Sequence, residues 1–263
     1  MGSEPMGGRR WGAAWRWSAV WRRNALVWRK LAAASLVGNF GEPLLYLLAL
    51  GYGLGAFVGE VQGLPYLAFL ASGIACASAM NAASLEGTYS AYTRMAVQRT
   101  WDAMLAAPLG VGDVVLGELA WAATKALINA APIVLVAWAL GAAELPGGLW
   151  ALPVLWLVGF VFGAVALVAT ALAPGYEFFL YFFTLLVTPM FLLSGVFFPL
   201  EVLPAWLQQA SKVFPLVHAV ELVRPLMAGR PVGPWAGHLA ALAGYALAGW
   251  VLAVWLLERR LMR

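Results

Sequence analysis

Long apolar runs constrain this chain more than any other feature of its sequence. The six runs lie at residues 33–57, 65–90, 114–140, 149–172, 177–199 and 235–257. Each is close to the ~20 residues that a helix needs to cross the hydrocarbon of a bilayer. With 63% hydrophobic and 11% charged residues, the chain cannot hide its apolar surface in one soluble core. We therefore expect an all-α, polytopic membrane protein with six transmembrane helices.

The basic residues predict which side of the membrane each end occupies. Twelve of the sixteen Lys and Arg residues precede the first run, separate the second run from the third, or follow the sixth. Basic residues are retained in the cytoplasm, so this distribution places both termini there. It also accounts for the net charge of +4 without a nucleic-acid partner. The single cysteine, Cys76, lies inside an apolar run, so no disulfide is expected within one chain.

Residues 1–32 are expected to form a cytoplasmic tail and an amphipathic helix. A helical reading places Trp17, Trp21 and Trp28 on one face and Arg23 and Lys30 on another. Tryptophan prefers the headgroup region, and basic side chains contact anionic lipid. The pattern favours a helix that lies in the membrane interface and contacts membrane lipid. Its role is either a topology anchor or a helix beside a gate that also contacts a cytoplasmic partner.

The longest cytoplasmic loop after the amino terminus runs from residue 85 to 118. Within it, the residues from Thr100 to Leu105 predict a short helix, with Thr100 as N-cap and Asp102 favourable in the first turn. This helix should end near Pro108. So short a helix is marginal in water by itself, so something must pack on it.

Two interpretations of this short helix remain open. It could dock into a groove of a soluble motor subunit, with an apolar centre and a polar rim. The apolar anchors would be Trp101, Met104 and Leu105, and the rim would be Arg99 and Asp102. Alternatively, the helix is a connector that packs on the protein's own helix ends.

Charged residues inside the apolar runs are candidates for a transport path. Glu118 and Lys125 are seven residues apart, which places them on one face of the third run. Embedded charges usually face a bundle interior or a water-filled cavity, where they could relay protons or bind substrate. We favour the structural alternative, in which Glu118 lies at the interface and Lys125 is neutralised by a partner helix or a second protomer.

The segment between Ser194 and Pro225 is too broken by proline for one helix and too apolar for an ordinary loop. Its four prolines predict two or three short helical pieces. Broken backbone near lipid must pack against protein or water. The orientation places this segment on the outer face, where its polar residues could form a gate or pathway. These residues are Glu201, His218, Glu221 and Arg224.

Several chemistries have no support in the sequence. The chain contains no GxxxxGK[ST] phosphate loop, so it does not hydrolyse ATP by that route. One cysteine and two widely separated histidines, His218 and His238, match no metal-ligand spacing. No metal or other cofactor is expected on this chain.

Five segments follow one another along the chain: LEGTYSAYTRM at 85–95, QRTWDAMLAAPL at 98–109, GELAWAATK at 117–125, SGVFFPLEVLPAWLQ at 194–208 and PLVHAVELVRP at 215–225. Together they resemble the membrane subunit of ABC-2 type exporters, in particular the NodJ-type permeases of lipooligosaccharide (nodulation-factor) export. The resemblance implies a half-transporter in the bacterial inner membrane that forms a homodimer. It also implies two copies of a separate nucleotide-binding ATPase, which would hold the ATP and Mg.

The same resemblance assigns roles to particular segments. Residues 33–263 become the transmembrane domain, and residues 98–109 become the coupling helix. Residues 199–226 become re-entrant external helices. Substrates of this family include lipooligosaccharides, glycolipids, polysaccharides and drug-like molecules. Two alternatives stay open: a proton-coupled carrier built on Glu118 and Lys125, or a membrane enzyme that acts on lipid-linked sugars.

Overall fold

The computed structural model describes residues 15–30, 32, 41 and 44–262. Most of these residues lie in helices. The sheet within the described part is a hairpin of β1 (Glu60–Val61) and β2 (Leu64–Pro65), paired antiparallel. The expectation of an almost wholly helical chain is therefore confirmed.

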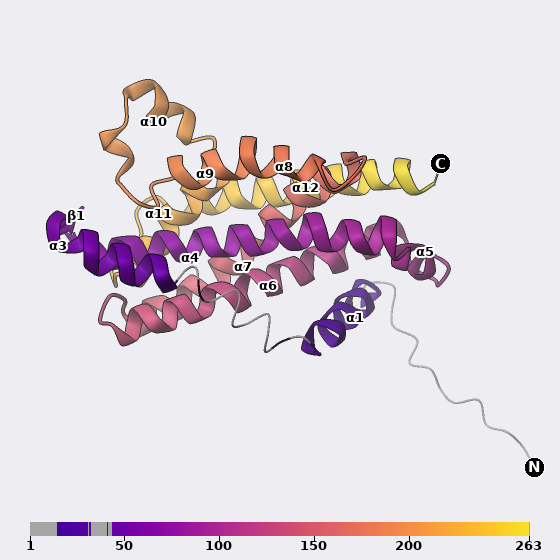
Figure 1. Ribbon diagram of the computed structural model, residues 1–263, viewed down its shortest axis with the longest axis horizontal. Helices are drawn as coiled ribbons and strands as arrows, with labels where there is room; N and C mark the ends of the chain where they lie inside the picture. The colour runs from indigo at the N-terminus through magenta and orange to yellow at the C-terminus, as the bar shows by residue number, and fades with distance from the viewer. Residues whose placement is uncertain (1–14, 31, 33–40, 42–43, 263) are drawn as a thin grey trace, which may run out of the picture.

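Four helices in the described ranges are long and apolar enough to cross a membrane. They are α4 (Tyr66–Leu85) with its π-helical extensions η3 (Glu86–Ser90) and η4 (Thr93–Val97), α6 (Val111–Ala139), α7 (Leu145–Leu172) and α12 (Trp235–Leu261). They run side by side along the long axis of the molecule (Figure 1). Four of the six expected spans thus correspond to long apolar helices, which fits a multi-pass membrane protein.

The other two expected spans are shorter where the structure describes them. The helix Phe178–Leu193 consists of α8 (Phe178–Phe182), η5 (Phe183–Val187) and α9 (Thr188–Leu193). The helix Leu44–Val58 contains η2 (Ala49–Leu54) and α3 (Gly55–Val58) and covers the second half of the first expected span. Most of the first half of that span, at residues 33–40 and 42–43, lies outside the described residues. A count of six spans stays a prediction.

Helix α7 packs against α4, α6, α11 and α12 and forms the centre of the bundle. Small residues allow this close approach, as is common between helices in membranes. At Gly163 of α7, an added Cβ would lie only 2.9 Å from the Cβ of Ala122 on α6. The side chain of Thr170 donates a hydrogen bond of 2.7 Å to the carbonyl oxygen of Gly87, which joins α7 to η3.

The proline-rich segment divides into three helical pieces, within the expected two or three. They are η6 (Leu200–Val202), α10 (Ala205–Ser211) and α11 (Pro215–Met227). Pro199 and Pro204 directly precede the first two pieces, and Pro215 begins the third. Pro225 instead lies inside the last turn of α11, where it removes one backbone donor without ending the helix.

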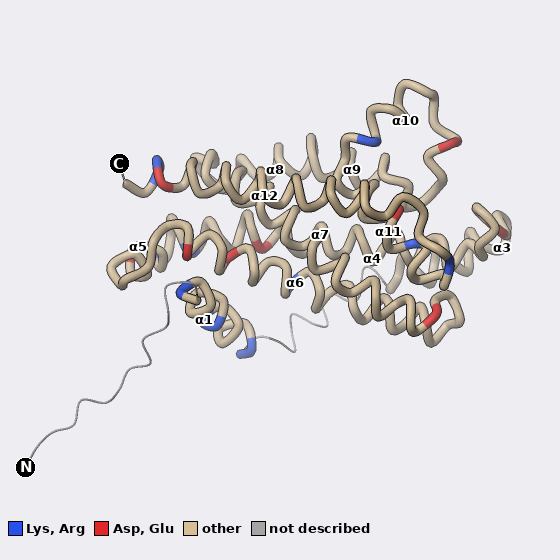
Figure 2. The backbone as a smooth tube through the Cα atoms, turned by 180° about the vertical axis from the view of Figure 1, so that it is seen from behind, with Lys and Arg blue, Asp and Glu red and all other residues tan. Residues whose placement is uncertain are grey.

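The two ends of the bundle carry different short elements (Figure 1). Helix α1 (Trp17–Arg29), helix α5 (Thr100–Leu105) and the last turns of α12 lie toward one end, called the α5 end below. The β1–β2 hairpin, α10 and α11 lie toward the other end, called the hairpin end. In the tube view, basic residues follow one another along α1 (Figure 2). The candidate site residues divide between these two ends.

Candidate functional site

A buried charge cluster occupies the α5 end, where η3, η4 and α6 meet. The Nε and Nη2 atoms of Arg94 donate hydrogen bonds of 3.0 and 2.5 Å to the two carboxylate oxygens of Glu118. The Nη1 atom of Arg94 lies 2.8 Å from Oε1 of Glu86, an ion pair without the alignment of a hydrogen bond. Both carboxylates are buried. One guanidinium thus faces two acids in a fork geometry that favours strong pairing.

Helix α5 is fixed to this cluster by Trp101. The indole Nε1 donates a hydrogen bond of 3.0 Å to Oε1 of Glu118, and the side chain is fully buried. The docking interpretation uses Trp101 as an anchor and the connector interpretation packs it on the protein's own helices, and in the structure it is packed inside the protein. A buried indole needs an acceptor for its N–H group, and the carboxylate of Glu118 supplies one.

The remaining residues of the α5 loop lie at or near the surface. Arg99, Asp102 and Pro108 are exposed, whereas Thr100, Met104 and Leu105 are half-buried. The expected N-cap also differs, because Arg99 occupies that position and Thr100 is the first helical residue. Arg99 adopts a left-handed conformation with φ of +49°, which is strained for a residue with a side chain.

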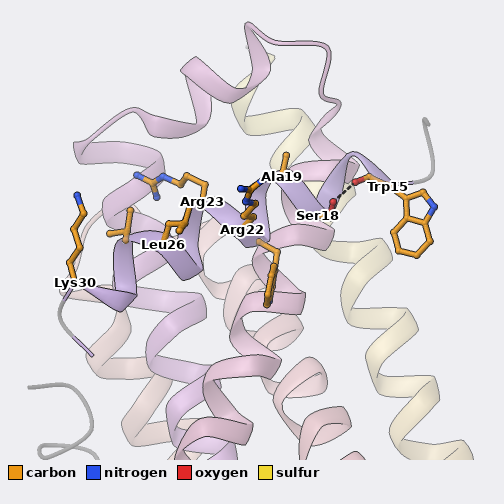
Figure 3. Close-up of a pocket in the computed structure, with 9 residues that line it drawn as sticks. Trp15, Ser18, Ala19, Arg22, Arg23, Leu26 and Lys30 are labelled. Carbon is orange, nitrogen blue, oxygen red and sulfur yellow. Dashed lines mark hydrogen bonds between the residues drawn. The ribbon is translucent and has the colours of Figure 1, made fainter. Parts of the chain in front are cut away.

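Helix α1 crosses the ends of the long helices and contacts α6 (Figure 3). The indole Nε1 of Trp21 donates a hydrogen bond of 3.0 Å to Oγ1 of Thr124. The rings of Trp28 and Trp121 lie 6.0 Å apart between centroids. At Gly117, an added Cβ would lie 2.6 Å from the carbonyl oxygen of Trp17, so only glycine permits this approach. All three tryptophans predicted for one face are half-buried, and they contact α6 through the backbone of Trp17 and the side chains of Trp21 and Trp28.

The outer side of α1 borders a hollow of about 600 Å³ (Figure 3). It is lined by Trp15, Ser18, Ala19, Trp21, Arg22, Arg23, Leu26, Val27 and Lys30. The described part of α1 contains no acidic residue. Burial, followed by the charge of Arg94, lowers the pKa of Arg23 from its usual value. The charge of α1 is therefore coupled to the cluster beneath it.

Glu118 and Lys125 do not form an ion pair with each other. The carboxylate of Glu118 is engaged by Arg94 and Trp101. The Nζ atom of Lys125 lies 5.5 Å from the ring centroid of Trp28, close to helix α1. Both residues lie in α6, two helical turns apart, but each has different neighbours.

A second buried arginine, Arg224, lies at the hairpin end. Its Nε donates to Oγ of Ser72 at 3.2 Å, and its Nη2 donates to the carbonyl oxygens of Phe69 and Gly195 at 3.3 and 2.6 Å. The guanidinium carbon lies 3.6 Å from the ring centroid of Phe69. Among the described residues, no carboxylate forms an ion pair with Arg224. All of its hydrogen-bond partners are neutral.

A cavity of about 220 Å³ opens beside Arg224. It is lined by Gln62, Leu64, Val220, Glu221, Arg224, Pro225, Arg230, Pro231, Gly233, Pro234 and His238. Glu221 and Arg224 were both expected at a gate, and the structure brings them to one cavity. Glu201 lies outside its lining and accepts a hydrogen bond of 3.3 Å from Nε2 of Gln62.

The structure joins two histidines that the sequence separates by twenty positions. The Nδ1 atoms of His218 on α11 and His238 on α12 lie 2.9 Å apart. Burial, followed by the charge of His238, lowers the pKa of His218. In the part of the chain that the structure describes, no three His, Cys, Asp or Glu residues form a group that could hold a metal.

Comparisons with known proteins show what the whole chain is similar to. A family model described as ABC-2 type transporter matches residues 16–228. The chain is 49% identical over 252 residues to Nodulation protein J of Sinorhizobium fredii, covering 96% of this chain and 94% of the relative. It is 48% identical over 258 residues to Nodulation protein J of Rhizobium meliloti, covering 98% and 96% of the two chains. Nodulation protein J of Azorhizobium caulinodans is 36% identical over 217 residues, covering 81% and 85%.

Proposed function

The chain belongs to the ABC-2 type transporter family, and from that premise we propose that it is the permease subunit of an ATP-driven exporter. The chain is a multi-pass membrane protein that serves as a transport subunit and not as an enzyme. The proposed substrate is an amphipathic lipooligosaccharide, glycolipid or polysaccharide. The resemblance to proteins named Nodulation protein J favours the lipooligosaccharide among these.

The proposed assembly is a homodimer of this chain with two copies of a separate ATPase. Membership in the family implies association with an ATPase subunit. ATP and Mg would bind to that partner and not to this chain. We place both termini in the cytoplasm of a bacterial inner membrane, because α1 and the end of α12 lie toward the same end and carry basic residues. Six spans, with residues 199–226 as re-entrant outer helices, complete this topology.

The observation that carries the coupling proposal is the link from α5 to the bundle. Trp101 bonds to Glu118 on α6, and Glu118 bonds to Arg94 at the end of the α4 helix. A displacement of α5 would therefore move two long helices through one buried carboxylate. Docking would use the exposed and half-buried residues of the loop, namely Arg99, Thr100, Asp102, Met104, Leu105 and Pro108. Trp101 would transmit the movement from inside.

The proposed mechanism is alternating access. ATP would close the partner dimer and bring the two coupling helices together. The first, second and fifth spans of both protomers would then open a path for the amphipathic substrate. Helix α1 would serve as the interface helix beside the entrance, and its contact with Thr124 and Gly117 of α6 supports a position there. A proton-driven carrier gains no support, because Arg94 and Trp101 already occupy the carboxylate of Glu118.

The docking proposal is tested by reversing the charge of one exposed residue of the loop. Asp102→Lys should reduce co-purification of the ATPase about tenfold, because it reverses one charge at the proposed polar rim, and Asp102 is exposed, so the fold should stay intact. Leu105→Asp is a second variant for the apolar contact. Val213→Asp, an exposed residue at the hairpin end, is the matched control. Co-purification equal to that of the control in both variants would place the docking surface elsewhere.

The driving force is tested separately by reconstitution in vesicles. Export should require the ATPase together with ATP and Mg. Export that runs on a proton gradient without the ATPase would overturn the proposal.

A further inference from the structure

The cavity beside Arg224 at the hairpin end contains a guanidinium that is held rigidly. Three acceptors fix two of its nitrogens, and the ring of Phe69 lies against its face. The acceptors come from two different segments, Phe69 and Ser72 of α4 and Gly195 of the chain after α9. Within the described ranges, no group accepts a hydrogen bond from the Nη1 atom, although the side chain lines the cavity. This donor is therefore available to a ligand.

A second guanidinium, that of Arg230, is also fixed at the cavity. Its Nη1 donates a hydrogen bond of 3.0 Å to the carbonyl oxygen of Gln62, and its Nη2 donates to that of Gly63. Both acceptors lie in the turn between β1 and β2. The backbone around Arg230 is stiffened by Pro231 and Pro234, whose rings fix φ. Neither arginine needs to be ordered when a ligand enters, which lowers the entropic cost of binding.

The charges around the cavity leave an excess of positive charge. Arg224 and Arg230 line it with a single carboxylate, that of Glu221, and with the imidazole of His238. Glu201 lies nearby but accepts a hydrogen bond from Gln62 and does not line the cavity. A buried arginine without a paired acid is costly, and an anion in the cavity would offset that cost.

We propose that this cavity binds an oxyanion group, a phosphate, sulfate or carboxylate, between Arg224 and Arg230. Guanidinium groups are suited to such ligands because their planar donors match two oxygens at once. The volume of about 220 Å³ admits one such group with its water and not a whole sugar chain. The oxyanion is either a free ion or the headgroup of an anionic lipid. This binding site goes beyond the transport role and does not depend on it.

The test measures equilibrium binding of radiolabelled phosphate and sulfate to the purified chain in phosphatidylcholine nanodiscs. Arg230→Gln should weaken binding about tenfold or more, because it removes charge-assisted hydrogen bonds. Arg230 and the two turn residues that it bonds, Gln62 and Gly63, are exposed, so water can replace the lost hydrogen bonds and the fold should stay intact. The matched control is Lys212→Gln, an exposed cation near the hairpin end that does not line the cavity. Arg224→Lys, which keeps the charge but loses the fork, should also weaken binding.

A second arm distinguishes the two sources of the oxyanion. Nanodiscs that contain phosphatidylglycerol should displace the labelled ions if the headgroup is the ligand, and should leave their binding unchanged if a free ion is. Either result supports the site, provided that Arg230→Gln weakens binding more than Lys212→Gln. Absence of saturable binding of phosphate, sulfate and phosphatidylglycerol would overturn the proposal, as would equal binding by the two variants. Neither outcome bears on ATP-driven export, which is measured separately.

Discussion

Arg94 and Arg224 are both buried arginines, but their surroundings differ in charge. At the α5 end, Arg94 pairs with the carboxylates of Glu86 and Glu118. The indole of Trp101 also donates a hydrogen bond to Glu118. At the hairpin end, a hydroxyl group, two carbonyl oxygens and an aromatic face surround Arg224. The first arrangement is a closed set of partners. The second leaves one positive charge without a negative partner among the described residues.

The difference indicates that the two ends have different roles. Removing one partner of a buried ion pair is strongly destabilising, because it leaves the other charge buried without compensation. The Arg94 cluster therefore ties the elements that contribute to it firmly together. A charge with neutral partners keeps its electrostatic attraction for an incoming anion. The contrast agrees with the two proposals made above, a coupling role for the α5 end and an oxyanion site at the hairpin end.

The largest effect should come from Arg94→Met. This change leaves Glu86 and Glu118 buried without a cation, and we expect the free energy of unfolding to fall by about 3–5 kcal/mol. The measurement is denaturant-induced unfolding in detergent micelles. Arg22→Met, at an exposed position on α1, is the matched control and should have little effect. Equal losses in the two variants would show that the cluster is not a structural joint.

Arg224→Met should cost less, although the substitution and the depth of burial are similar. It leaves only neutral acceptors without a donor, so we expect a loss of about 2–3 kcal/mol in the same unfolding experiment. A loss as large as that of Arg94→Met would contradict the comparison. It would mean that Arg224 holds a carboxylate in the assembled protein.

Trp101→Phe should have a smaller effect, because Glu118 keeps its pairing with Arg94. Loss of one hydrogen bond to a charged group should lower the free energy of unfolding by about 1.5 kcal/mol. We also expect a lower rate of export per bound ATPase, because α5 loses its polar link to α6. Trp206→Phe, an exposed position at the hairpin end, is the control for both measurements. Unchanged export with the ATPase bound would remove Trp101 from the coupling route.

The smallest effect should be a pH dependence from His218. Its pKa in the folded protein lies below the ordinary value of 6.5, through burial first and the charge of His238 second. The unfolded chain therefore binds the proton more readily, and the stability should fall as the pH drops below about 6.5. His218→Asn should flatten the dependence of the melting temperature on pH between about 7.5 and about 5.5. An unchanged slope would mean that His218 does not contribute to the pH dependence in this range.

The sequence predicts the parts of this protein that depend on local pattern. The runs at 65–90, 114–140, 149–172 and 235–257 correspond to the four long helices, because apolar length is a local property. The breaks at Pro199, Pro204 and Pro215 follow from the missing N–H group of proline. The family and its transport role follow from motifs in a fixed order.

The tertiary partners could not be predicted in the same way. The residues around Trp101 leave two interpretations open, because a short helix with apolar residues needs a cover and the pattern does not say whether that cover is the same chain. The signal that could have placed it is the N–H group of the indole, which needs an acceptor such as Glu118. His218 and His238 meet only because α11 packs against α12, a contact between helices that spacing along the chain cannot reveal.

The absence of a side chain at Gly117 sets how closely α1 packs on α6. Because the backbone of Trp17 lies against this glycine, a single added methyl group would clash with it and push the two helices apart. Alanine at this position would lift α1 without adding or removing a charge. The distance between the amphipathic helix and the bundle thus depends on the size of one side chain that carries no charge.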